Sequence, residues 1–126
     1  MRLTRSLIKL HFLVLLPNAD DAVIDPAKLR DYLLSTEHPV GRFKARFFSA
    51  LGFSVNRWQE LDSAFRTQHL TQEVESTAVV SGGQKFTIRA MLIGPNGQSA
   101  GVVSVWFIRT GEAIPRFVTA YPGTQQ

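Results

Sequence analysis

The spacing of apolar residues divides the chain into a helical half, from Leu16 onward, and a strand half that follows it. Asp25 and Pro26 mark the first helix start, because a capping carboxylate precedes a proline at the first helical position. Gly52 stands where a left-handed cap would end the second helix. The pattern predicts helices at residues 26–34, 42–51 and 57–69.

The second and third predicted helices carry apolar residues at helical spacing. Phe43, Phe47 and Leu51 follow one another at intervals of four residues, so they are expected to form one buried face. Leu61 and Phe65 mark the buried stripe of the third helix. The strand residues expected to pack against them are Ile88, Val103, Val105 or their neighbours.

The second half of the chain changes to the β-branched content that predicts strands. Strands are predicted at residues 77–81, 84–93, 99–109 and 114–121. Glycine-containing turns join them, and strands joined by tight turns run antiparallel. The expected fold class is therefore α+β, with two or three N-terminal helices packed on a four-stranded antiparallel meander.

The last predicted strand carries hydroxyl groups that can donate to a phosphate. Phe117, Thr119 and Tyr121 are expected to share one face, because side chains alternate along a strand. The alternate positions, beginning with Arg116, take the other face. Threonine and tyrosine are also good strand formers, so strand propensity explains them equally well.

Composition and charge narrow the function classes. The 126 residues allow one domain, and the lack of cysteine excludes disulfides, thiolate metal sites and cysteine nucleophiles. Fourteen Lys and Arg against ten Asp and Glu give a net charge of +4. Ten of these cations are arginine, which suits bidentate phosphate contacts. The excess favours an anionic partner such as RNA, although a plain solvated surface also explains it.

The common cofactor and metal motifs do not occur in the sequence. It has no GxxxxGK, no GxGxxG after a strand, no GxSxG and no HExxH. The three histidines, His11, His38 and His69, stand too far apart for a local zinc motif. Neither a cofactor nor a metal is therefore expected.

Cations gather in the second predicted helix. Arg42 and Arg46 are i, i+4 neighbours around Lys44, so two guanidinium groups share one helix face. No acidic residue occurs between Glu37 and Glu60. This pattern is typical of a ridge that contacts phosphates, and a solvated helix face is the alternative.

Two histidines and a strand arginine complete the candidates. His69 continues the apolar stripe of the third helix, as either a hydrogen-bonded structural histidine or a proton-transfer group. His38 precedes Pro39, where stabilisation of the turn is the alternative to a substrate contact. Arg89 lies on the predicted non-core face of its strand, where exposure or ion pairing is usual.

The ends of the chain need their own interpretation. We expect an N-terminal extension at residues 1–15, the domain at 16–122 and a tail at 123–126. The first sixteen residues resemble the start of a signal peptide, but Lys9 and His11 interrupt the apolar run, which is shorter than the roughly 20 residues of a membrane span. A strand or extra leader residues are the alternatives. We expect the segment before Pro17 to lie outside the packed core, and the protein to be cytoplasmic and free of the membrane.

Several segments of the chain carry sequence motifs that also occur together in other proteins. They are residues 16–20, 38–48, 51–52, 106–109 and 115–119. On these segments the chain, over about residues 15–122, resembles a small uncharacterised bacterial domain family. Members of that family are short proteins beside a small partner gene, or C-terminal modules of polymorphic toxins. Their element order and terminal strand are similar to those of the barnase/EndoU/RelE-like ribonuclease toxins.

The resemblance implies a ribonuclease toxin that holds RNA on its sheet and is neutralised by a small cognate antitoxin or immunity protein. Metal-free RNA cleavage needs a base, an acid and cations at the phosphate. By their chemistry, the candidate catalytic residues are His69, Lys44, Arg89, Thr119 and Tyr121. The candidate substrate-binding residues are His38, Arg42, Arg46 and Arg116. The alternative function is a non-catalytic protein-binding module, with the contact residues Trp106, Phe107 and Tyr121.

Overall fold

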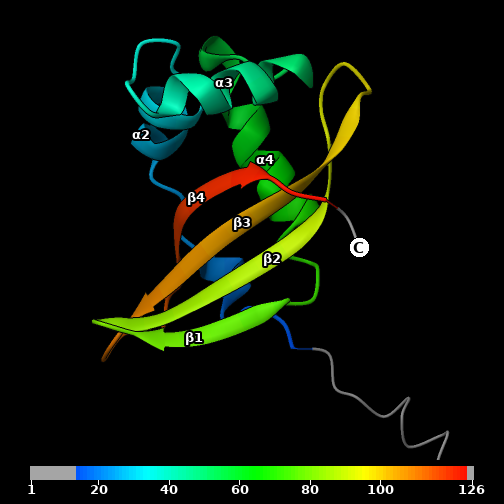
Figure 1. Ribbon diagram of the computed structural model, residues 1–126. Helices are drawn as coiled ribbons and strands as arrows, with labels where there is room; N and C mark the ends of the chain where they lie inside the picture. The colour runs from blue at the N-terminus through cyan, green and yellow to red at the C-terminus, as the bar shows by residue number, and fades with distance from the viewer. Residues whose placement is uncertain (1–13, 125–126) are drawn as a thin grey trace, which may run out of the picture.

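A computed structural model of the protein describes residues 14–124, which form one antiparallel sheet with helices on one side of it (Figure 1). The strands are β1 (Ser76–Val80), β2 (Gly83–Ile93), β3 (Ser99–Arg109) and β4 (Arg116–Pro122). They lie in the order β1-β2-β3-β4, and each pairs antiparallel with the next. The predicted α+β meander is confirmed.

The helical half follows the predicted order with small changes. Its elements are η1 (Ala19–Asp21), α2 (Pro26–Lys28), the π-type segment η2 (Leu29–Leu33), α3 (Gly41–Ala50), η3 (Val55–Arg57) and α4 (Trp58–Gln68). The backbone N–H of Ala27 donates to Oδ1 of Asp25 at 3.0 Å, so the predicted helix cap forms. Gly52 has a φ of 97°, which confirms the left-handed end of α3. In Figure 1, α4 lies behind the sheet and α2 and α3 lie above β4.

The core lies between the helices and one face of the sheet. Phe48, Phe65 and Trp106 are fully buried within it. Leu61 and Leu51 are also buried, as expected, and Phe47 packs against the core from its edge.

The buried face of α3 differs from the predicted one. Phe43 is 65% exposed, whereas Gly41, Ala45 and Phe48 are buried. The helix turns its small residues toward η2, because this stripe permits a closer approach than a row of phenylalanines. The expectation that Phe43 is buried was wrong.

The middle of strand β3 is buried on both faces of the sheet. Val103 and Val105 alternate with the core residue Trp106 and therefore lie on the face opposite the helices. We refer to this face of the sheet, opposite the helices, as the open face. Arg89 and Tyr121 flank Val103 in the two neighbouring strands. Of the strand residues expected against the helices, Ile88 lies in the core, and the neighbours Val102 and Trp106 take the place of the two valines.

A β-bulge in β4 changes which of its residues face the core. Val105 pairs with Thr119 and Trp106 pairs with Phe117, so Val118 is an extra residue between them. Phe117 therefore lies in the core, while Thr119 lies with Val105 on the open face. The predicted common face of Phe117 and Thr119 was wrong, because strict alternation does not hold across a bulge.

Packing begins before Pro17, and backbone contacts continue to Gly123. Leu16 is only 2% exposed and belongs to the core, which contradicts the expectation for the segment before Pro17. The carbonyl of Val14 accepts from the backbone N–H of Val74 at 2.7 Å. At the other end, the backbone N–H of Gly123 donates to the carbonyl of Gly101 at 3.0 Å. The signal-like features at residues 1–13 lie outside the described residues.

Candidate functional site

Lys44, Tyr32 and Thr119 form a hydrogen-bonded group that we call the Lys44 cluster. The side chain of Lys44 projects from α3 toward the bulged strand β4. Its Nζ donates to the phenol oxygen of Tyr32 at 2.9 Å and to Oγ1 of Thr119 at 2.8 Å. These bonds use two of the three donors of an ammonium group. The third remains for a ligand as far as the hydrogen bonds of residues 14–124 show.

Local backbone features bring these three side chains together. A Cβ on Gly41 would overlap the carbonyl of Tyr32, so glycine lets the start of α3 approach η2 closely. The bulge at Val118 turns Thr119 toward Lys44 from the sheet side. The cluster therefore depends on contacts between three elements that are far apart in sequence.

The environment of Tyr32 makes its phenol more acidic than usual. Burial by itself would raise the pKa, but hydrogen bonds with Lys44 and Thr119 outweigh it. The positive charges of Lys44 and Lys28 lower the pKa further, so the net pKa lies below the ordinary value of 10. Tyr32 can therefore ionise more readily than a tyrosine in water.

His38 caps the start of α3 and stands beside Tyr32. Its Nδ1 accepts from the backbone N–H groups of Val40 at 3.0 Å and Gly41 at 2.9 Å. Because both groups donate to Nδ1, the proton of the neutral ring is on Nε2. The ring meets that of Tyr32 edge-on, with 4.9 Å between the centroids. His38 thus offers a hydrogen-bond donor, Nε2–H, beside the cluster.

A cavity of about 490 Å³ opens in front of these groups. The residues that line it are Asp25, Ala27, Lys28, Tyr32, His38, Lys44, Val118 and Thr119. Nζ of Lys28 donates to the carbonyl of Val118 at 3.3 Å, which places a second ammonium in the wall. A phenol with a lowered pKa, two ammonium groups, and the donors of His38 and Thr119 can together bind a phosphate and move a proton.

A family model described as a domain of unknown function, DUF6883, matches residues 15–124. The chain belongs to this family. No protein of curated function matches it significantly.

A solved structure shares the fold of this DUF6883 domain. It is titled a contact-dependent growth inhibition toxin–immunity protein complex from Klebsiella pneumoniae 342. The match has a TM-score of 0.64 at 18% identity and covers 85% of this chain and 97% of that chain. At this identity the likeness shows a common fold.

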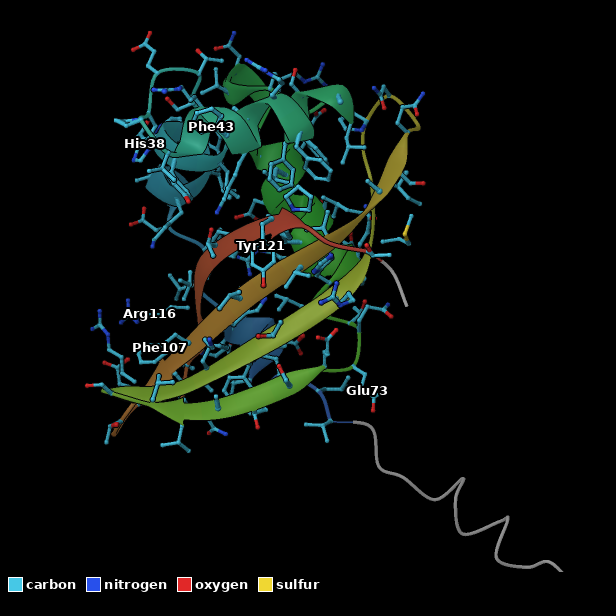
Figure 2. All side chains as sticks on the ribbon, in the orientation of Figure 1. His38, Phe43, Glu73, Phe107, Arg116 and Tyr121 are labelled. Atoms are coloured by element: carbon cyan, nitrogen blue, oxygen red, sulfur yellow. The ribbon has the colours of Figure 1, made fainter. Side chains whose placement is uncertain are left out.

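The structure of the DUF6883 domain brings together three of the predicted site residues, Lys44, Thr119 and His38. Tyr121 stands close by on the open face, with its ring centroid 5.9 Å from Nζ of Lys44 (Figure 2). Turn stabilisation, the alternative considered for His38, is also present in its bonds to the start of α3.

His69 lies in the interior instead. It is fully buried, and its Nδ1 is 2.7 Å from the hydroxyl of Ser104, which accepts from the indole N–H of Trp106. Burial lowers the pKa of His69 to about 4, although the Ala90 carbonyl opposes this shift. The structural interpretation of His69 fits this position, and no substrate group reaches it in this conformation.

The predicted arginines do not join the Lys44 cluster. Arg89 donates to Glu75 and to the carbonyl of Thr124 at the edge of the open face, as an ion-paired strand arginine does. Arg42 and Arg46 lie on the exposed side of α3, where the guanidinium of Arg42 stacks 4.7 Å from the ring centroid of Phe43. The cation ridge is therefore a separate surface.

Sequence reasoning missed Tyr32. Its ring fits the apolar side of the first helix, and a helical tyrosine carries no local signal of its hydroxyl partner.

Trp106, expected on the surface of the alternative binding module, is fully buried, so it contacts no partner there.

Two further findings concern metal sites and membrane-spanning helices. Among residues 14–124, no group of three or more His, Asp or Glu side chains is arranged to hold a metal ion. Within the same part of the chain, no helix has the length and apolar character needed to cross a bilayer.

Proposed function

We propose that this domain is a metal-independent ribonuclease toxin that acts on cytoplasmic RNA and is neutralised by a small cognate protein. The observation that carries the proposal is the Lys44 ammonium bonded to the Tyr32 phenol at the edge of an open cavity. A phenol with a lowered pKa beside fixed positive charge supplies what cleavage of a phosphodiester needs without a metal.

In this mechanism Tyr32 is the base and Lys44 returns the proton. The ionised phenol takes the proton of the RNA 2′-OH, and the 2′ oxygen attacks the phosphorus. The bond from phosphorus to the 5′ oxygen then breaks. Lys44 gives a proton to that oxygen and regains one from Tyr32 along their 2.9 Å hydrogen bond. The products are a 2′,3′-cyclic phosphate and a 5′ hydroxyl.

The remaining groups hold the phosphate while charge builds on it. Thr119 is fixed beside Lys44, and Lys28 adds a second positive charge in the cavity wall. His38 donates from Nε2 to a phosphate oxygen, because its Nδ1 is occupied by the start of α3. In this proposal His38 binds the substrate and leaves proton transfer to Tyr32 and Lys44.

The fold supports the toxin-and-partner setting. The domain shares its architecture with a chain of a structure whose title names a growth inhibition toxin and its immunity protein. A net charge of +4 also favours a polyanionic substrate.

Inducing the full chain in a bacterial host tests this function. We expect growth arrest with fragmented RNA, and rescue by co-expression of a small cognate partner protein. The matched control is Arg57→Ala, an exposed arginine that pairs with Glu60, which should arrest growth as the wild type does. Harmless expression with intact RNA would contradict the proposal.

Protein recognition is a second candidate function, because the edge strand β1 is exposed to solvent. All five of its residues are exposed, and Val79 is 87% exposed. An edge strand can pair with a strand of another protein. A chain that binds a small cognate partner protein tightly but leaves RNA and growth unaffected would favour this function instead.

A further inference from the structure

We propose that the groove beside β4 continues into a second subsite, built by Phe107, Arg109 and Arg116, that binds the nucleotide next to the cleaved linkage. This inference rests on the proposed function, since it extends the same groove. The ligand is single-stranded RNA, with a base against Phe107 and a phosphate between the arginines.

Continuity of the groove is the first argument. A second cavity, of about 270 Å³, lies farther along β4 and shares Asp25, Lys28 and Val118 with the first. Arg116 pairs with Phe107 and Thr119 pairs with Val105, two residues along β3, so the two lie about 7 Å apart along the strands at the usual strand rise. A strand whose phosphate sits at Lys44 therefore reaches this cavity with its neighbouring nucleotide.

The charged side chains at the end of the groove away from Lys44 are the second argument. Nη1 of Arg109 lies 3.8 Å and Nε of Arg116 3.6 Å from the carboxylate of Glu112. Ion pairs this long between exposed side chains contribute little, so a phosphate can displace the carboxylate. Together with Lys28 of the shared wall, the two guanidinium groups make this end of the groove positive.

The position of Phe107 is the third argument. Phe107 pairs with Arg116 across β3 and β4, and Figure 2 shows the two side chains together at one end of the sheet. The tip of the ring lies over the β1–β2 hairpin, where a Cβ on Gly83 would come within 2.8 Å of it. With glycine there, no side chain from that position meets the ring, which is half-buried and has Lys85 of β2 as its cross-strand neighbour. A half-buried aromatic ring among cationic side chains is typical of a base-stacking platform.

Binding of RNA that cannot be cleaved tests the subsite apart from catalysis. The probes are a dinucleotide and a tetranucleotide with 2′-O-methyl groups, titrated against the full chain. We expect Phe107→Ala to weaken the binding of both probes about 5- to 150-fold, the range for one stacked base. We expect Arg116→Ala to lower the slope of log affinity against log salt by about 0.7 for the tetranucleotide and to leave that of the dinucleotide unchanged, because the dinucleotide has no second phosphate. Glu112→Gln should tighten binding, because it removes the competing carboxylate.

The controls are Phe43→Ala and Arg57→Ala, which remove an exposed phenylalanine and an exposed arginine outside the groove. Tetranucleotide binding by Phe107→Ala and Arg116→Ala at wild-type affinity would overturn the subsite, as would equal losses in the controls or no binding by the wild type. RNA cleavage by the wild type would then still support the proposed function. Selective losses in a wild type that does not cleave RNA would support the subsite and refute the nuclease.

Discussion

Tyr32 can act as a base only when its phenol is ionised, so the cleavage rate should follow that ionisation. In the wild type, kcat/KM should rise with pH through a pKa below 10. Lys44→Met removes the hydrogen bond and the charge that lower this pKa, so the remaining activity should rise only at higher pH. A pH–rate profile of each protein measures this. An identical rising limb in both would contradict the role of Lys44 in ionising Tyr32.

The buried histidine links stability to pH. The pKa of His69 is about 4 in the folded protein and 6.5 in the unfolded chain, so between these values the unfolded state binds more protons. Neutral His69 therefore contributes in full to the free energy of unfolding above pH 6.5. This contribution, about 3 kcal/mol in all, is lost as the pH falls from 6.5 toward 4. Urea unfolding at pH 7 and pH 4.5 should show a larger loss in the wild type than in His69→Gln. Equal losses would mean that the pKa of His69 is the same in the folded and unfolded states.

At the scale of single residues, the sequence predicted part of the site. Lys44 stood out in an acid-free run of cations, and Thr119 as a hydroxyl on a strand. Their hydrogen bond joins residues 75 positions apart, which local spacing does not encode. Tyr32 was missed because its ring satisfies the apolar pattern of a helix, while its function depends on the hydroxyl and on distant partners.

At the scale of elements, helix α3 shows what periodicity leaves open. Both Phe43–Phe47–Leu51 and Gly41–Ala45–Phe48 have helical spacing, and each is apolar enough to be buried. Close packing of Gly41 against Tyr32 selects the second stripe. The bulge in β4 is a similar case, since alternation alone cannot place an extra residue.

This choice of stripe predicts opposite effects for two phenylalanines of α3. Phe48→Ala should lower the free energy of unfolding by about 3–5 kcal/mol, because its ring is fully buried. Phe43→Ala should change it by no more than about 0.5 kcal/mol, since that ring is mainly exposed. Urea titrations with an unchanged m-value measure both. A large loss in Phe43→Ala with a small one in Phe48→Ala would restore the stripe predicted from sequence.

At the scale of the whole molecule, the α+β architecture was predictable because its signals are local. Hairpin glycines, strand composition and the Asp25–Pro26 helix start each report on a few neighbouring residues. The groove was not predictable, because it lies between the segment at residues 23–32 and β4, which the chain connects only through the whole sheet.

The rate of RNA cleavage by the purified full chain in EDTA, wild type against Lys44→Met, tests the central claim most directly. Methionine keeps the apolar stem of the lysine and removes its charge, and melting curves verify that the variant is folded. The wild type and Arg57→Ala should cleave RNA in EDTA and leave 2′,3′-cyclic phosphate ends. Lys44→Met should be slower by about 10²–10⁴-fold. Cleavage by Lys44→Met at the wild-type rate, or no cleavage by the wild type in EDTA, would contradict the account.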